Sequence, residues 1–289
     1  MLYLILSALC SAVLTIVLKL FRDPKGNRFG LLLGNYMTCM LIAFLQIPEK
    51  GRLISVSAPT LLMSVIGGFL FVAGLVLMQT SVAANGAALT AAFSKLGLIV
   101  PQLISFLFFR EVPSLPNALG LALAAAAIWL ISTASGGIEE SRASSGKGRA
   151  GLTVLILTLL ACGCSESMAK IFSRLGDQRE DTCYFFFLFL TAALLTFALS
   201  VSETKKSGKR LRLPEVAAGI LAGIPNYFSS YFMLKALLDL PATLVYPVFS
   251  VGSILLVMLA GTLFFREKLG RRQLEGMGLI LGALVLLNL

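Results

Sequence analysis

The sequence predicts an all-α polytopic membrane protein in which ten transmembrane helices form two inverted five-helix repeats. The chain of 289 residues is 57% hydrophobic and only 13% charged, and its mean hydropathy is +0.91, unlike the composition of a soluble domain. Its apolar runs of about 18 to 28 residues are long enough to cross a bilayer as helices. Helices are also the form in which these runs satisfy their own backbone hydrogen bonds in lipid.

The repeat is visible in the letters of the chain. Residues 93–111 return as residues 249–267 at one offset of 156 residues, with eight of nineteen positions identical and the ending LFFRE shared. Two unrelated apolar segments would share leucine and phenylalanine, but not the charged ending in the same register. The same offset places Gly67 on Gly223. We interpret this pattern as an internal duplication.

Five spans are predicted in the first half. Residues 1–20 are apolar throughout and lack the basic leader and cleavage site of a signal peptide. A charged loop separates them from the span at 29–47. The span at 59–79 contains three glycines that allow close helix packing. The first copy of the repeated stretch forms the span at 93–111, and the alanine-rich span at 115–131 follows.

Five further spans are predicted in the second half. Residues 152–172 carry two charged side chains, and residues 183–201 begin with the aromatic run YFFFLF, which we expect to pack in lipid or in the core. The most basic loop precedes the span at 214–238. The ninth span follows the turn at Leu240-Pro241 and contains the second copy of the repeated stretch, 249–267, and residues 273–287 form the last span.

A Gly/Ser-rich charged linker at 134–150 separates the first repeat, 1–133, from the second, 151–289. Because each repeat has an odd number of spans, the second enters the membrane from the opposite side. Inverted repeats of this kind build two alternating gates around one site in many secondary transporters.

Charge predicts the orientation and excludes one class of partner. The net charge is +10, but the basic residues are scattered over short loops and form no continuous face for nucleic acid. The loops on the side away from the termini hold 15 lysines and arginines, against 5 on the termini side. The positive-inside rule therefore places both termini outside the cell membrane.

The sequence argues against an enzyme or a metalloprotein. All five cysteines lie in or beside apolar runs, where cysteine behaves as a small hydrophobic residue, and no disulfide framework follows. The chain contains no histidine, which removes the commonest general base and a usual zinc ligand. We expect no cofactor.

The arrangement resembles the drug/metabolite transporter superfamily, and specifically its EamA-type bacterial members, over essentially the whole chain. The matching residues are Glu111 and Glu267 at the span exits, Gly120 and Gly276 after them, and Leu234-Lys235-Ala236 followed by Pro241-Ala242. The resemblance implies a carrier for small molecules such as amino acids, nucleotide sugars, phosphorylated sugars, choline-like cations or drugs. It also implies cytoplasmic termini, which is the reverse of what the charge count predicts.

Charges deep in the spans are candidate site residues, because burying a charge in the membrane is costly. Lys95 is predicted to line a central cavity and bind a carboxylate or phosphate of the substrate; alternatively it is a buried partner of Glu166. Glu166 and Lys170 stand four residues apart on one helix, so they form either an internal ion pair or a coupling site. A carboxyl group in a weakly hydrated cavity can take up and release a proton.

Uncharged polar groups at depth are the remaining candidates for substrate binding, although several are expected only to pack. They are Asn35, Tyr36, Gln79, Asn226, Tyr227, Tyr231 and Tyr246. Pro225 precedes two of them and can free backbone carbonyl groups on the same helix, which is a common way to build a site at mid-membrane.

The sequence therefore predicts a secondary active transporter that moves a small polar metabolite across the cell membrane by alternating access, with an amino acid or organic anion favoured and proton coupling open. A proton-coupled exporter of cationic drugs or amines is the first alternative, and a membrane-embedded lipid-handling protein is the second. The expected partners are a small-molecule substrate, the lipid bilayer and protons. A GxxxG pair, Gly278 and Gly282, either forms a homodimer or packs against the fifth span within a monomer.

Overall fold

The computed structural model describes residues 1–20, 27, 29–85, 90, 93–94, 96–111, 114–134, 148–208, 211–265 and 271–287. In this part of the chain every regular element is helical, which confirms the predicted all-α class. The α-helices are α1 (Leu2–Leu20), α2 (Gly30–Gln46), α3 (Ala58–Asn85), α5 (Ile99–Phe109), α6 (Leu115–Ala134), α8 (Gly148–Leu175), α9 (Asp181–Ser207), α10 (Leu213–Asp239), α11 (Ala242–Phe265) and α12 (Arg271–Leu287). Two short 3₁₀ segments are η1 (Lys50–Leu53) and η2 (Gln178–Glu180). Most of the predicted linker lies outside the described residues.

Proline and glycine set several helix ends. Helix α2 stops at Gln46, two residues before Pro48, and α10 stops before Pro241, because proline cannot continue the backbone hydrogen-bond pattern. Pro214 lies in the first turn of α10, where its missing N–H group costs nothing. Helix α9 ends at Ser207 and is followed by Gly208, whose φ of 69° is a left-handed conformation that glycine adopts freely.

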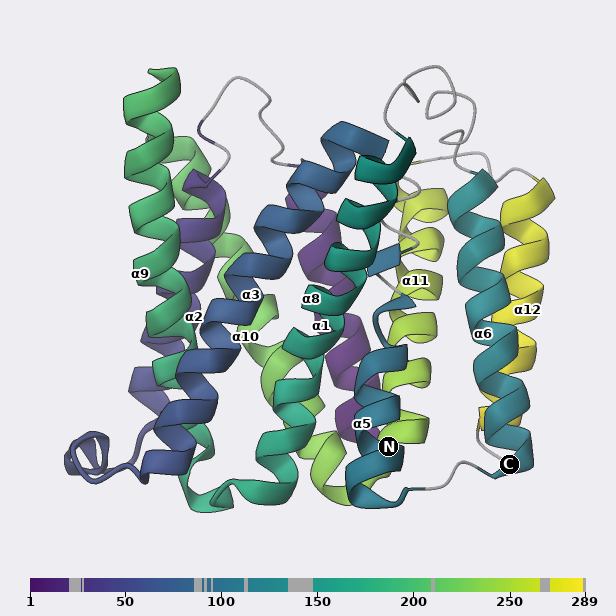
Figure 1. The fold of residues 1–289 in the computed structure, drawn as a ribbon, viewed down its shortest axis with the longest axis horizontal. Coiled ribbons are helices and arrows are strands. Elements are labelled where there is room, and N and C mark those ends of the chain that lie inside the picture. The colour runs from purple at the N-terminus through teal and green to yellow at the C-terminus, as the bar shows by residue number, and fades with distance from the viewer. Residues whose placement is uncertain are drawn as a thin grey trace.

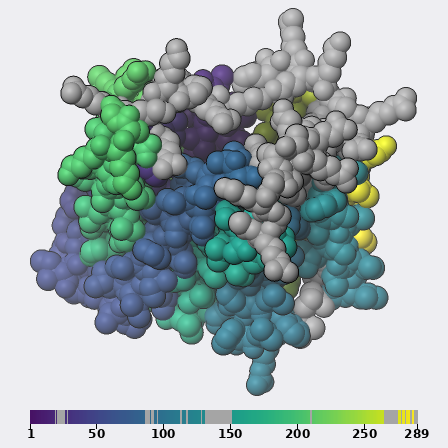
Figure 2. All heavy atoms as spheres, turned by 45° about the horizontal axis from the view of Figure 1, so that its top comes forward, coloured from purple at the N-terminus to yellow at the C-terminus, as the bar shows by residue number. Residues whose placement is uncertain are grey.

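The helices form one bundle with α6 and α12 paired at one end and α2 and α9 at the other (Figure 1). Between these pairs, α10 packs against α2 and α1, and α3 packs against α9 and α8. Figure 2 shows α3 between α9 and α8 on one face of the molecule. The N- and C-termini lie at the same end of the bundle (Figure 1).

Glycines bring two helix pairs into backbone contact. A Cβ atom on Gly219 of α10 would lie 2.0 Å from the carbonyl oxygen of Leu31 on α2. A Cβ atom on Gly68 of α3 would lie 2.5 Å from the carbonyl oxygen of Leu188 on α9. At these positions only glycine permits the observed helix separation.

The outer surface is apolar, as expected for a protein surrounded by lipid. Large side chains such as Phe69, Phe108 and Leu263 are more than half exposed. Within the described residues, four helical stretches are long and apolar enough to cross a membrane: Ala58–Asn85, Gly151–Leu175, Gln178–Ser207 and Ala242–Leu263.

The two glycines of the GxxxG pair in the last helix, Gly278 and Gly282, have different surroundings. Gly282 packs toward α6, since a Cβ atom there would lie 3.2 Å from Leu123. Gly278 is exposed, and a Cβ atom there would meet nothing within 4 Å. Gly282 thus serves packing inside the chain.

Candidate functional site

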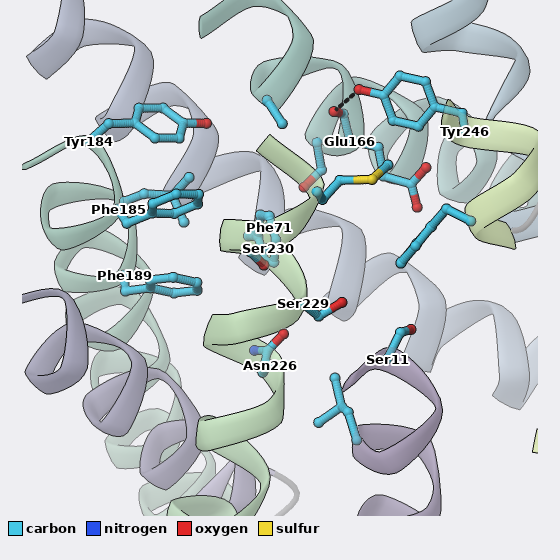
Figure 3. Close-up of a pocket in the computed structure, with 16 residues that line it drawn as sticks. Ser11, Phe71, Glu166, Tyr184, Phe185, Phe189, Asn226, Ser229, Ser230 and Tyr246 are labelled. Atoms are coloured by element: carbon cyan, nitrogen blue, oxygen red, sulfur yellow. Dashed lines mark hydrogen bonds between the residues drawn. The ribbon is translucent and has the colours of Figure 1, made fainter. Parts of the chain in front are cut away.

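A cavity of about 210 Å³ lies between α1, α3, α8, α9, α10 and α11 (Figure 3). Its wall combines aromatic rings, apolar side chains and a few polar groups. The aromatic residues are Phe71, Tyr184, Phe185, Phe189, Tyr246 and Phe249. The polar residues are Ser11, Ser165, Glu166, Asn226, Ser229 and Ser230, and the apolar ones are Leu14, Ala169, Leu188 and Met233. Of the sequence-predicted site residues, the structure brings Glu166, Asn226 and Tyr246 to this cavity.

Glu166 supplies the carboxylate of the cavity wall. It lies on α8, in the second half of the chain, and is partly buried. A serine precedes it and another follows it on the same helix. The hydroxyl group of Tyr246 donates a hydrogen bond to the backbone carbonyl of Glu166 at 2.8 Å (Figure 3). This bond holds α11 against α8 at the level of the carboxylate.

Two polar contacts join α10 to the first half of the chain beside the cavity. Asn226 Nδ2 donates to Asn35 Oδ1 on α2 at 3.0 Å. Ser7 and Ser229 exchange hydrogen bonds: each hydroxyl donates to the backbone carbonyl of the other residue, at 2.8 and 3.1 Å. Asn35 is buried and lies behind Asn226 rather than on the cavity wall.

Helix α9 contributes an aromatic wall that the sequence did not assign to the site. Tyr184, Phe185 and Phe189 pack in the core, as expected for the YFFFLF run, and also line the cavity. Phe185 and Phe189 are one turn apart and stack with ring centroids at 6.1 Å. Their four-residue spacing on one helix face is the signal that could have identified them.

Three predicted tyrosines pack beside the cavity without lining it. Tyr36 is buried among aromatic rings of α3 and α9. Tyr227 is fully buried, and its hydroxyl group donates to Gln46 Oε1 at 2.8 Å. Tyr231 stacks on Tyr227, and Lys235 Nζ lies 5.3 Å from the centre of its ring.

The remaining uncharged candidate, Gln79, lies on α3 away from the cavity wall. Its buried Oε1 atom has no hydrogen-bond partner in the described part of the chain. Lys95 lies outside the described residues, so its place in the cavity stays a prediction.

Lys170 points to a different carboxylate than the helical spacing suggests. Its ammonium group is fully buried and donates to Glu111 Oε1 at 2.6 Å. Arg174 pairs with the same oxygen atom, and the N–H group of Ala242 donates to Glu111 Oε2 at 2.9 Å. The hydroxyl group of Ser105 also donates to this carboxylate. Lys170 therefore belongs to a junction of α5, α8 and α11.

Glu111 reaches this junction because of how α5 ends. Arg110 adopts a left-handed conformation with φ of 54°, and the N–H group of Glu111 donates back to the Ser105 carbonyl at 3.3 Å. Burial alone raises the pKa of Glu111, but hydrogen bonds from Lys170, Ser105, Arg174 and the Ala242 N–H group lower it to about 2. The sequence analysis identified Glu111 as a repeated position and as a residue of the family resemblance, but no pattern in the sequence indicated its partners.

No group of three cysteine, aspartate or glutamate side chains within the described ranges is arranged to hold a metal ion. The geometry instead offers a mainly apolar, aromatic-walled space with a few polar side chains on its wall. Such a space suits a small organic ligand.

Comparison with known proteins identifies the family. A model of the EamA-like transporter family matches residues 151–289. Multidrug resistance protein EbrA of Bacillus licheniformis is 32% identical over 104 residues, which make up 95% of EbrA and 36% of this chain. The chain belongs to the EamA-like transporter family. It is therefore a multi-pass membrane protein of the drug/metabolite transporter superfamily.

Two other proteins match over nearly the full length, one in sequence and one in structure. An uncharacterized protein of Haemophilus influenzae is 25% identical over 287 residues, covering 96% of this chain and 93% of that protein. A protein of known crystal structure aligns with a TM-score of 0.76 at 13% identity, covering 99% of this EamA-like chain and 94% of the other. The second match shows a shared fold.

Proposed function

We propose that this protein is a secondary active transporter that carries small organic molecules with a protonated amine across the cell membrane by alternating access. The observation that carries the proposal is the carboxylate of Glu166 in a cavity walled by aromatic rings. An ionisable group at this depth is costly to bury and marks a ligand pathway. Aromatic faces attract a cation, and a carboxylate neutralises it.

The chemistry of the cavity wall narrows the range of cargo that the sequence predicts. An amino acid presents an ammonium group to Glu166, and Lys95 would then take its carboxylate, as the sequence predicts. An organic anion without an amine gains nothing from Glu166. The described wall therefore favours amines and amino acids within the predicted range of cargo.

We further propose ten spans in two inverted repeats, 1–133 and 151–289, joined by the linker at 134–150. The helix neighbours support this symmetry, because three of the contacts between the two halves have a counterpart with the halves exchanged. The contact between α2 and α10 corresponds to the contact between α9 and α3. In the same way, the contact between α1 and α10 corresponds to that between α8 and α3, and the contact between α1 and α11 corresponds to that between α8 and α5.

Two of these contacts are also similar in residue type, although the offset of 156 aligns Gly67, the neighbour of Gly68, with Gly223. A Cβ atom on Gly223 of α10 would lie 2.5 Å from the Cβ of Thr38 on α2. A Cβ atom on Gly68 of α3 would lie 2.7 Å from the Cβ of Thr191 on α9. A glycine of one half thus meets a threonine of the other half in both places.

Alternating access requires one end of the cavity to be closed while the other is open. At the end where the termini lie, Glu111 ties the exit of α5 to α8 and to the start of α11. At the same end, Ser57 Oγ donates to Glu180 at 2.6 Å and ties α3 to the start of α9. Both ties join the two halves, and opening this end would break them. By the lysine and arginine count this end faces outward.

Proton-coupled export of cationic drugs or amines is the second candidate. The similarity to EbrA, a multidrug resistance protein, favours it. In this case Glu166 releases a proton when it binds the cation and takes up a proton when the cation leaves. Amine transport that does not respond to an imposed pH gradient would exclude this coupling and leave the carrier proposal intact.

Replacing Glu166 with glutamine is expected to reduce amine transport by about tenfold or more, because a charge-assisted hydrogen bond contributes about 1.5–3 kcal/mol. The measurement is uptake of a radiolabelled aromatic primary amine into proteoliposomes. Glu49→Gln is the matched control, since the Glu49 side chain is 74% exposed and is expected to leave uptake unchanged. Equal uptake by wild type and Glu166→Gln would refute the role of this carboxylate.

A further inference from the structure

Asn226 is the one amide side chain on the described cavity wall, and its orientation is fixed from behind. Its Nδ2 atom donates to Asn35 Oδ1 at 3.0 Å. The single S–H group of Cys39, one turn along α2, lies within hydrogen-bond distance of two acceptors, Asn35 Oδ1 at 3.4 Å and the Gly223 carbonyl at 3.2 Å. Asn35 is only 4% exposed, so it makes this contact inside the protein.

The Asn35 contact determines which atom of Asn226 meets the cargo. An amide carries two N–H donors on its nitrogen and accepts only through its oxygen. Because the nitrogen is turned to α2, the oxygen is presented to the cavity, as the close-up shows (Figure 3). The Asn226 side chain therefore acts there as a hydrogen-bond acceptor.

Two other polar groups of the cavity wall also present hydrogen-bond acceptors to the cargo. The Glu166 carboxylate is an acceptor, and the Ser229 hydroxyl has its proton engaged by the Ser7 carbonyl at 3.1 Å. A cargo with several N–H groups can satisfy such a wall. A quaternary ammonium ion has charge but no N–H donor, and it would leave the Asn226 oxygen desolvated without a partner, which is costly.

We propose that Asn226 makes the transporter select primary and secondary ammonium groups over quaternary ammonium groups, and that Asn35 is the positioning residue that aims the Asn226 carbonyl at the cargo. This inference rests on the proposed function, because it assigns the cargo chemistry of the same cavity. Glu166 attracts the positive charge of either kind of cation, whereas Asn226 distinguishes between them.

The backbone around the amide pair is held rigidly enough for this role. A Cβ atom on Gly219 would lie 2.9 Å from the Asn35 N atom, and one on Gly223 would lie 2.7 Å from the Asn35 carbonyl oxygen. Helices α2 and α10 are thus in close backbone contact at Asn35, at both its N–H and its carbonyl group. Fixed positions of this kind are what selective recognition requires.

The test compares two probes that differ only at nitrogen, 2-phenylethylammonium and its N,N,N-trimethyl derivative. Their dissociation constants are measured by calorimetry with the purified full-length protein in detergent at neutral pH. Wild type is expected to bind the primary ammonium on the order of tenfold tighter. Asn226→Leu, which is similar in size, is expected to bring the ratio of the two constants close to one.

Variants of Asn35 separate positioning from contact. Asn35→Ala removes the acceptor for Asn226 Nδ2 and is expected to lower the ratio toward one, whereas Asn35→Asp keeps an acceptor oxygen and is expected to preserve it. The ratio cancels any general change in cation affinity that the aspartate introduces. Melting curves without ligand verify folding, and Asn226→Ala replaces Asn226→Leu if the latter does not fold.

Each outcome separates the inference from the proposed function. Equal affinities of the two probes for wild type would overturn the selectivity and leave amine transport standing. A wild-type preference that persists in Asn226→Leu would overturn the role of Asn226, and one that persists in Asn35→Ala would overturn positioning by Asn35. Failure of wild type to bind either probe would overturn the amine proposal itself.

Discussion

Replacement of Glu111 with alanine is expected to lower the free energy of unfolding by about 3–5 kcal/mol, because it leaves a fully buried ammonium group without its counter-charge. The carboxylate pairs with Lys170 and Arg174 and accepts from the first N–H group of α11. Thermal melting of the purified protein measures the effect, with an expected shift on the order of 10 °C. A shift below about 2 °C would contradict the central position of this junction.

A second substitution at Lys170, the buried partner of Glu111, provides the control for this prediction. In the Glu111→Ala background, Lys170→Met removes the unpaired buried charge and is expected to restore part of the lost stability.

Low pH is expected to weaken the same contact between Glu111 and Lys170. Because the pKa of Glu111 is lowered from 4.5 to about 2 in the folded protein, its contribution is complete above pH 4.5 and is lost as the pH falls toward 2. The difference in melting temperature between wild type and Glu111→Ala should narrow over that range.

The second large effect is expected from Gly219→Ala. The added methyl group would lie 2.0 Å from the Leu31 carbonyl oxygen, a backbone atom that cannot move without separating α2 from α10. Overpacking of this kind costs about 1–3 kcal/mol or more. The separation would also break the hydrogen bond between Asn226 and Asn35. We therefore expect a lower melting temperature together with loss of the preference for the primary ammonium probe.

Gly278→Ala is the matched control on α12. A Cβ atom at Gly278 would meet nothing within 4 Å, and alanine is the better helix former by about 1 kcal/mol. Its melting temperature should equal or exceed that of wild type. Equal stability of the Gly219 and Gly278 variants would show that α2 and α10 are not in backbone contact.

Much of the fold follows from local properties of the sequence. The apolar runs give the helices, since a chain in lipid must satisfy its backbone hydrogen bonds within each segment. Pro48, Pro214, Pro241 and Gly208 mark helix ends that the structure places within a few residues of those positions. Glu166, Asn226 and Tyr246 could be predicted to line a cavity because a polar side chain deep in a span is costly unless it faces the protein interior or a hydrated space.

The contacts that build the site could not be predicted in this way. Asn35 and Asn226 are 191 positions apart, and Glu111 and Lys170 are 59 apart, so no helical periodicity relates them. Spacing paired Lys170 with Glu166, whereas the turn after α5 brings Glu111 to it instead. The aromatic wall of α9 was missed because its composition is equally typical of lipid-facing and core packing.

Alternating access through the Glu166 cavity is tested most directly by chemical labelling from each side of the membrane. Ser230 lines the cavity, and Ser230→Cys is introduced into a variant whose five native cysteines are replaced. The protein is reconstituted in vesicles and treated with a membrane-impermeant thiol reagent applied to one face at a time. We predict labelling from both faces, reduced in each case by an aromatic primary amine. Labelling from a single face, unchanged by the amine, would contradict a carrier with one alternately exposed site.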